Sequence, residues 1–263
     1  MTTSPPFNSL IVTFNSAHEI AYLLDDLQRL APPQNRVIVI DNASQDLTVE
    51  IVKTRFPEVS LIVNPRNVGY SKAVNQGFEL CETEFVFLLN PDIRIPNSSF
   101  HPAMLACLQH SPNIAAVGPL QFRQIGESLL LNFTWSYLTP RAWVLFLSYA
   151  FRLGLTFDRP IPTTFLNAGC LLLRRSAFIH VGKLNEKYFL YGEEPDLFLK
   201  LKRYRYECRL HPGAEVIHLR ERSLNQLPVI QRGLIKFQAL LNISDALVNG
   251  LINLCPRLSP PVG

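Results

Sequence analysis

The first hundred residues alternate short apolar runs with segments of helical periodicity, and this alternation restricts the folds open to the chain. The runs have the length and β-branched composition of buried strands, and the segments between them carry apolar residues every three to four positions. Strands are predicted at 10–12, 37–40, 61–63 and 85–89, and helices at 20–30, 46–56 and 70–80. Strand and helix in strict alternation predict an α/β fold, with a mostly parallel sheet covered by helices on both faces.

The pattern weakens beyond residue 100. Helices are predicted at 104–110 and 194–203, strands at 115–117 and 168–174, and an amphipathic helix or helix pair at 229–250. Two local signals predict where helices begin. Ser16 and Glu19 have the spacing of a capping box before the first helix. Pro195 is expected at the first position of the helix at 194–203, where proline is tolerated.

Composition narrows the classes of function. The 263 residues carry 25 Lys and Arg against 21 Asp and Glu, and a net charge of +4 does not indicate a nucleic-acid-binding protein. The five cysteines form no Cys-x-x-Cys pair, which excludes a disulfide framework or zinc knuckle as the organising feature and favours a reducing compartment. The sequence has no signal-peptide pattern and no apolar run of the roughly 18–20 residues that span a membrane. We therefore expect a cytoplasmic protein.

Polar side chains follow three of the four predicted strands. These segments are Thr13-Phe14-Asn15, Asp41-Asn42 and Asn90-Pro91-Asp92. Ligands of open α/β sheets bind beyond the carboxyl ends of the strands, so the three segments predict a binding edge. The first strand is followed neither by the glycine-rich dinucleotide fingerprint nor by a phosphate-binding P-loop. The segment 67–72 opens a helix, so its free amides and Lys72 are suited to face an anion.

The order of these motifs resembles glycosyltransferase family 2. The resemblance is carried by residues 11–15, 39–46, 67–69, 90–92, 167–175, 188–197 and 211–218. It implies a GT-A fold, in which a Rossmann-like nucleotide half at about 1–100 merges with an acceptor half at about 101–225. A C-terminal amphipathic helical segment and tail are expected at 226–263. The Asn-Pro-Asp turn and the Tyr-x-Glu-Glu-x-Asp segment are most similar to the rhamnosyltransferase-like branch of the family.

The resemblance implies a divalent metal, Mg²⁺ or Mn²⁺, because a departing nucleoside diphosphate builds negative charge that a cation stabilises. Asp92 matches the family's metal or diphosphate residue, and His218 is expected to complete the site as a neutral imidazole ligand. The family often has Asp-x-Asp at this turn, whereas this chain has Asn90 in the first place. Strict dependence on metal is therefore left open, as is a purely structural role for His218.

The resemblance also places the nucleotide. Asp41 is suited to accept a hydrogen bond from the base, and the remaining pocket residues are expected to surround the base, ribose and diphosphate. These residues are Thr13, Asn15, Asp46, Asn67, Gly69 and Lys72. Asp46 could instead cap the following helix, and neither of these two roles excludes the other.

The acceptor hydroxyl must lose a proton as it attacks the sugar, so a carboxylate base is expected. By resemblance the base is the second acid of a pair at a helix N-terminus, which is Glu194 here, with Glu193 as the second choice. Asp196 is expected to cap the helix or to bind acceptor. In the alternative reading, all three acids serve only the first helical turn through the helix dipole.

These features together predict an inverting glycosyltransferase that moves a sugar, such as rhamnose, from a nucleotide-diphospho-sugar donor to a glycan or lipid-linked acceptor. The product is expected in cell-surface polysaccharide. A non-catalytic sugar-nucleotide or glycan-binding protein and a nucleotidyltransferase are the alternatives. The aromatic, arginine-flanked segment 135–157 is read either as a peripheral contact with the inner face of the membrane or as an ordinary core helix.

Overall fold

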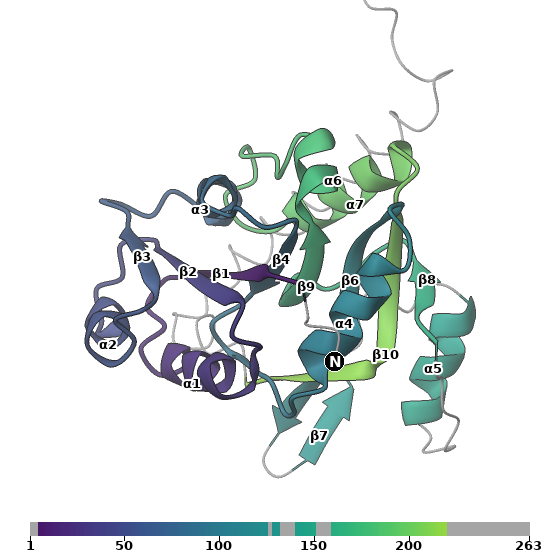
Figure 1. Cartoon of the computed structure of the whole chain (residues 1–263), viewed down its shortest axis with the longest axis horizontal. Helices are drawn as coiled ribbons and strands as arrows, with labels where there is room; N and C mark the ends of the chain where they lie inside the picture. Colours follow the sequence, from purple (N-terminus) through teal and green to yellow (C-terminus); the bar gives the residue numbers. More distant parts are fainter. Residues whose placement is uncertain (1–4, 126–127, 132–139, 151–158, 220–263) are drawn as a thin grey trace, which may run out of the picture.

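The computed structural model describes residues 5–125, 128–131, 140–150 and 159–219. Over these residues the chain forms a single sheet with helices on both faces (Figure 1). The strands are β1 (Phe7–Thr13), β2 (Asn35–Asp41), β3 (Ser60–Val63), β4 (Phe85–Leu89), β5 (Ile93–Arg94), β6 (Ile114–Ile125), β7 (Ser128–Leu131), β8 (Ile161–Thr163), β9 (Cys170–Arg174) and β10 (Glu207–His218). The helices are α1 (Ile20–Leu30), α2 (Thr48–Arg55), α3 (Tyr70–Glu79), α4 (Phe100–Gln109), α5 (Pro140–Ala150), α6 (Arg175–His180) and α7 (Glu193–Arg203).

The strands run in the order β3-β2-β1-β4-β9-β6-β10-β5. The first four predicted strands pair in parallel, which confirms the predicted α/β class. Strand β9 enters antiparallel between β4 and β6, and β6 and β10 are again parallel to each other. This strand was expected from its apolar residues, but its direction was not. It joins the two halves of the chain into one continuous sheet.

Each face of the sheet carries its own apolar core because alternate strand residues point to opposite sides. Leu10 and Val12 of β1 contribute to the core beneath α3, α5, α6 and α7. Phe7 and Ile11 of the same strand contribute to the core beneath α1, α2 and α4. Figure 1 shows α1 and α2 on one side of the parallel strands and α3 on the other. Burial on both faces explains why these strands read as continuous apolar runs.

The predicted capping box before α1 is wrong. The helix begins at Ile20 with Glu19 as its N-cap residue, and no side chain caps it. The backbone carbonyl of Ser16 accepts hydrogen bonds from the N–H groups of Glu19 and Ile20 instead. The hydroxyl of Ser16 interacts with the backbone of Phe14, so this serine stabilises the loop after β1 rather than the helix.

Helix α7 begins one residue earlier than predicted. Gly192 precedes it in a left-handed conformation (φ 100°), and Glu193 is its first residue. Pro195 is therefore third in the helix, not first. Its missing N–H is still harmless there, because the first four N–H groups of a helix have no partner within the helix.

Several sequence predictions lie outside the described residues. The C-terminal segment 226–263, with the helix expected at 229–250, is among them. Of the segment 135–157, only the residues of α5 are described. Within the described part of the chain, no helix is both long and apolar enough to cross a bilayer. The domain boundary expected near residue 225 remains a prediction.

Candidate active site

Asp41 organises the carboxyl ends of β1 and β2. Its side chain is fully buried, and its Oδ1 accepts hydrogen bonds from the hydroxyls of Thr13 (2.8 Å) and Ser44 (2.5 Å). Its Oδ2 accepts the backbone N–H of Ser44 at 2.8 Å. The structure thus brings together Thr13 and Asp41, as predicted for a shared pocket. It also shows that Asp41 holds the loop after β2, a role that sequence alone did not indicate.

Two loops at this edge are tied to each other by Asn15 and Asp46. The N–H of Asn15 donates to the Ser44 hydroxyl, and Asn15 Oδ1 accepts the N–H of Gln45, both at 2.8 Å. Asp46 accepts the N–H groups of Ala17 and Thr48, both at 3.0 Å. Burial raises the pKa of Asp46, but the hydrogen bonds from Thr48 and Ala17 outweigh it and hold the pKa below the ordinary value.

The predicted turn at 67–69 joins this edge to the second half of the chain. Asn67 Oδ1 accepts the N–H of Gly69 at 2.9 Å, and the carbonyl of Gly69 accepts from Asn42 Nδ2 at 3.2 Å. Gly69 has φ 88°, and a Cβ built on it would lie 2.8 Å from Cδ2 and 2.9 Å from the carbonyl oxygen of Phe189. Glycine is therefore required where the segment before α7 crosses the start of α3. The N–H of Tyr70 donates to the same Phe189 carbonyl at 2.8 Å.

Asp92 and His218 lie together at the end of β10. Nε2 of His218 is 3.0 Å from Oδ1 of Asp92, and both side chains are largely buried, with 19% and 17% exposed. Strand β5 follows Asp92 directly and pairs antiparallel with β10, so that Ile93 faces His218. The N–H of Leu219 also donates to the Asp92 carbonyl at 2.8 Å. The two residues predicted as a metal pair are thus neighbours.

Glu194 lies in the first turn of α7 and faces the small-residue segment before β9. Its Oε1 accepts the N–H of Ala168 at 3.1 Å. The next residue, Gly169, approaches the imidazole of His218 so closely that a Cβ on it would lie 3.0 Å from His218 Cε1. The carbonyl of Gly169 accepts the N–H of Asn90 at 2.9 Å. Residues 168–169 therefore bridge Glu194 to the Asn90–Asp92 turn and to His218.

Burial dominates the ionisation of the two adjacent acids. It raises the pKa of Glu194 to about 7, although the Ala168 N–H and His218 act to lower it. Burial, together with the charge of Glu194, raises the pKa of Glu193 to about 8. Burial and then these two acids also raise the pKa of Tyr70 well above its ordinary value. The start of α7 and the start of α3 thus share one buried environment.

Of the two remaining predicted residues, Lys72 lies where its predicted role requires and Asp196 does not act as a helix cap. Lys72 lies in the first turn of α3 with an exposed side chain, as its proposed role toward an anion requires. Asp196 does not cap α7, because Gly192 is the N-cap residue. Its carboxylate lies 2.8 Å from Nζ of Lys200 and lines a cavity of about 420 Å³ with Lys200 and Arg203. Binding of acceptor by Asp196 remains a prediction.

Sequence reasoning missed several polar residues that complete this edge. Asn64 Nδ2 donates to Asn42 Oδ1 at 3.0 Å, and its backbone N–H donates to the Asp41 carbonyl at 2.8 Å. Gln121 of β6 donates to the Asn167 carbonyl at 3.0 Å, and its buried Oε1 has no hydrogen-bond partner among the described residues. A polar residue inside an apolar strand was the available signal for Gln121, but β6 was predicted only as far as residue 117.

Two of the described side chains, Asp92 and His218, are the protein ligands available for the predicted metal at this site. In the described part of the chain, no three or more His, Cys, Asp or Glu side chains are grouped so as to hold a metal ion. Asp92 and His218 provide one carboxylate and one imidazole at 3.0 Å. Adjacent ligands of an octahedral ion with bonds of about 2.1 Å lie about 3 Å apart, and Mg²⁺ commonly takes one or two carboxylates with substrate phosphates and water. The pair therefore fits a metal that the diphosphate helps to hold.

A model of the family described as "Glycosyl transferase family 2" matches residues 10–182. The chain belongs to this family. The match begins within β1 and ends just after α6, so it includes the four parallel strands β1 to β4 and the antiparallel strand β9. The predicted family is therefore confirmed.

Relatives and solved structures agree with this assignment. The chain is 28% identical to an N-acetylglucosaminyl-diphospho-decaprenol L-rhamnosyltransferase of Mycobacterium tuberculosis, over 82% of this chain and 77% of the relative. It is 26% identical to a low-salt glycan biosynthesis hexosyltransferase of Haloferax volcanii, over 80% and 66%. A mannosyltransferase from Pyrobaculum calidifontis, in complex with GDP-Man and Mn²⁺, superposes with a TM-score of 0.63 at 17% identity, over 99% of this chain and 78% of that one.

GalNAc-T7 with UDP, GalNAc and Mn²⁺ superposes with a TM-score of 0.69 at 16% identity. The match covers 84% of this chain but only 45% of GalNAc-T7, so this chain spans less than half of that protein. At these identities the two structures establish the fold. The GT-A fold predicted from the motifs is confirmed.

Proposed function

We propose that this protein is an inverting glycosyltransferase, which moves a sugar from a nucleotide-diphospho-sugar to a hydroxyl of a lipid-linked acceptor. The observation that carries the proposal is the bridge at 168–169. There Glu194 accepts the N–H of Ala168, and Gly169 contacts the Asn90–Asp92 turn. A base and a diphosphate-binding pair at one edge are the two groups that a displacement at an anomeric carbon needs.

Glu194 is the proposed general base. A base acts best when its pKa lies near the working pH, and burial raises the pKa of Glu194 to about 7. In its ionised form the carboxylate takes the proton of the acceptor hydroxyl as that oxygen attacks the sugar. Burial and the charge of Glu194 also raise the pKa of the neighbouring Glu193. Attack from the face opposite the nucleotide inverts the anomeric carbon.

Asp92 and His218 are the residues that would hold a Mg²⁺ or Mn²⁺ ion. A bound divalent ion supplies positive charge to the diphosphate as the sugar leaves it. The GDP-Man and UDP complexes of structurally similar proteins contain Mn²⁺, which supports this assignment. Lys72, exposed in the first turn of α3, provides a further positive charge on the anion side.

The nucleotide is proposed to lie across the ends of β1 and β2. Asn15 and Asp46 fix the loops that border it, and Thr13 and Asp41 form its buried floor. Each carboxylate oxygen has two lone pairs, and Asp41 Oδ2 uses one of them for Ser44. One acceptor position on Asp41 is thus unused by the protein, and because this side chain is fully buried, the base reaches it only if the loop at Ser44 moves aside. Asn67 and Gly69 form the far wall: Asn67 accepts the N–H of Gly69, whose carbonyl accepts from Asn42.

Rhamnose is the proposed donor sugar, and a diphospholipid-linked sugar the proposed acceptor. Both come from the similarity to the mycobacterial rhamnosyltransferase, whose name states them. A lipid-linked acceptor would place the reaction at the inner face of the membrane, with the protein bound peripherally. The product would then enter cell-surface polysaccharide.

The proposal is tested in two steps. Thermal unfolding is first followed with dTDP-, UDP- and GDP-sugars, with and without Mn²⁺; a ligand at a hundredfold excess over Kd adds about 2.7 kcal/mol to the free energy of unfolding. The nucleotide sugar that binds is then incubated with a lipid-linked acceptor, and NMR gives the anomeric configuration of the product. We expect transfer with inversion. Binding without transfer would favour a non-catalytic sugar-nucleotide-binding protein, and transfer of the nucleotidyl group would favour a nucleotidyltransferase.

A further inference from the structure

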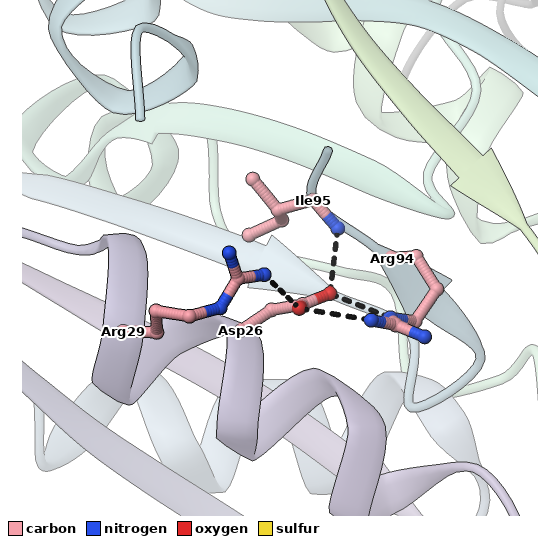
Figure 2. Close-up of polar contacts among 4 residues, drawn as sticks. All are labelled: Asp26, Arg29, Arg94 and Ile95. Atoms are coloured by element: carbon pink, nitrogen blue, oxygen red, sulfur yellow. Dashed lines mark hydrogen bonds and ion pairs between the residues drawn. The ribbon is translucent and has the colours of Figure 1, made fainter. Parts of the chain in front are cut away.

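A buried ion pair lies beside the Asn90–Asp92 turn. Asp26 of α1 has a side chain only 1% exposed, and it accepts hydrogen bonds from Arg94 Nε at 2.6 Å and Arg94 Nη2 at 3.1 Å. It also accepts the N–H of Ile95 at 3.0 Å and Arg29 Nη2 at 2.9 Å (Figure 2). Burying a carboxylate costs several kcal/mol unless it is paired and fully hydrogen-bonded, as this one is. Such an arrangement fixes its partners in one geometry.

Two of the partners of Asp26, Arg94 and Ile95, belong to the segment that carries Asp92. Arg94 is two residues from Asp92 and forms β5 with Ile93, a strand of only two residues. This strand pairs with the end of β10, where Ile93 faces His218 and Arg94 faces Ile217. So short a strand contributes few ladder hydrogen bonds of its own. Its position therefore depends on what holds it from the other side.

Helix α1 holds it from that side. Besides the ion pair and the Ile95 hydrogen bond to Asp26, the guanidinium of Arg94 lies 5.2 Å from the ring centroid of Tyr22, also in α1. Two different parts of the segment, a side chain and a backbone N–H, thus bind one carboxylate. The carboxylate therefore ties β5, and the residue that follows it, to α1.

We propose that Asp26 is a positioning residue, which through Arg94 and Ile95 holds Asp92 beside His218 in the geometry that binds the metal and the diphosphate. It touches neither metal nor substrate. The inference rests on the proposed function for the role of the Asp92–His218 pair. The effect of Asp26 on the geometry of that pair can be measured without any turnover.

The chain offers a matched control. Asp25 is the neighbouring residue on the same helix and also pairs with an arginine, Arg55 at 3.1 Å, but both side chains are about half exposed. The variant Asp25→Asn removes the same charge from the same helix but leaves every hydrogen bond between Asp26 and the β5 segment in place. The variant Asp26→Asn keeps the shape of the side chain but weakens its bonds to Arg94 and Ile95.

Two measurements test the proposal. Binding of Mn²⁺ alone is followed by the loss of its free EPR signal, and the imidazole of His218 is followed by ¹⁵N NMR in the metal-free protein. We expect Asp26→Asn to raise the Kd for Mn²⁺ about tenfold and to shift the His218 signals, whereas Asp25→Asn changes the Kd less than twofold and leaves the signals in place. If Asp26→Asn does not fold, Arg94→Lys takes its place, since Arg94 is 35% exposed.

Each outcome decides the matter. A folded Asp26→Asn protein with unchanged Mn²⁺ affinity and unchanged His218 signals would overturn the proposal and leave Asp26 with a purely stabilising role. If the wild type binds no Mn²⁺, the metal part of the proposed function fails. The His218 signals then still show whether Asp26 sets the geometry of the pair. The double variant Asp26→Asn with Arg94→Lys is expected to shift the His218 signals no further than the more strongly shifted of the two single variants, because the two residues act as one unit.

Discussion

The imidazole of His218 lies 3.0 Å from the carboxylate of Asp92, although the two residues are far apart in the sequence. Asp92 follows β4, and His218 ends β10. Strand β9 makes this meeting possible, because it lies antiparallel between β4 and β6 and so joins the two halves. Residues 168–169, directly before β9, then bring Glu194 to the same edge.

Replacing Asp92 by Asn is expected to reduce turnover strongly and to raise the Mn²⁺ concentration needed for half-maximal activity. The substitution removes the one carboxylate of the Asn90–Asp92 turn but keeps its shape. Turnover is measured over a series of Mn²⁺ concentrations and after EDTA treatment, with Asp25→Asn as the control. Full activity of wild type and variant in EDTA would show that no metal acts here, and Lys72 would then be the first candidate for stabilising the leaving group.

Replacing Asp41 by Ala is expected to weaken both the fold and nucleotide binding. Three donors from Thr13 and Ser44 lose their acceptor in a buried site. One unsatisfied buried donor costs about 1–3 kcal/mol, so the free energy of unfolding should fall by at least that amount in urea titrations. Asp25→Ala, at an exposed pair, should cost no more than about 1 kcal/mol. A stable Asp41→Ala protein that binds nucleoside diphosphate normally would remove Asp41 from both roles.

Replacing Gly69 by Ala tests the contact between the start of α3 and the segment before α7. The residue has φ 88°, and its new Cβ would meet Phe189 at 2.8 and 2.9 Å. A backbone conformation of this kind costs about 1–3 kcal/mol for a residue other than glycine. Gly182 is a matched control, since it has φ 87° but nothing within 4 Å of its Cβ position. We expect Gly69→Ala to lower the melting temperature more than Gly182→Ala; equal losses would mean that Phe189 simply moves aside.

The sequence predicted those parts of the site that local pattern determines. The ends of β1 and β2 could be placed because two apolar runs stop at Thr13 and Asp41, and parallel strands end at one edge. The burial of Asp41 could not be predicted, because it depends on Ser44 folding back over the strand end. The start of α7 was predicted one residue too late, because the glycine itself is the one sequence signal for the left-handed turn at Gly192.

The second half of the sheet was less predictable for a physical reason. Strands β6, β9 and β10 pair across long stretches of chain, so their direction follows from tertiary packing and not from local periodicity. Gln121 and Asp26 illustrate the same limit. Gln121 is a polar residue between two apolar ones and Asp26 is one of two adjacent acids, and the partners that bury them, Asn167 and Arg94, lie far along the chain.

The free energy of unfolding is expected to fall as the pH rises from about 4.5 to about 8. Burial raises the pKa of Glu193 to about 8 and of Glu194 to about 7, so the folded state holds these protons more tightly than the unfolded state. Stability is then greatest below the unfolded pKa and is lost as the pH passes through the folded values.

Urea unfolding at pH 5, 6.5 and 8.5 measures this dependence. The variant Glu193→Gln carries no ionisable group at that position and should flatten the fall. Glu79→Gln is the control, because a hydrogen bond from Lys183 lowers the pKa of Glu79, so this group is ionised in both states from pH 5 upward and should leave the fall unchanged. A wild-type stability that rises steadily over this range would show that neither acid is buried as described.

Replacing Glu194 by Gln is expected to lower kcat by about 10²–10⁴, the usual contribution of a general base, with donor affinity nearly unchanged. The amide keeps the size of the side chain but cannot take a proton. In the wild type, kcat should rise with pH through about 7 as the carboxyl ionises. Glu194→Asp should retain part of the activity, because it keeps an ionisable carboxylate one methylene shorter. Loss of activity in Glu193→Gln, with Glu194→Gln active, would make Glu193 the base; if both variants are active, the two acids serve only the first turn of α7.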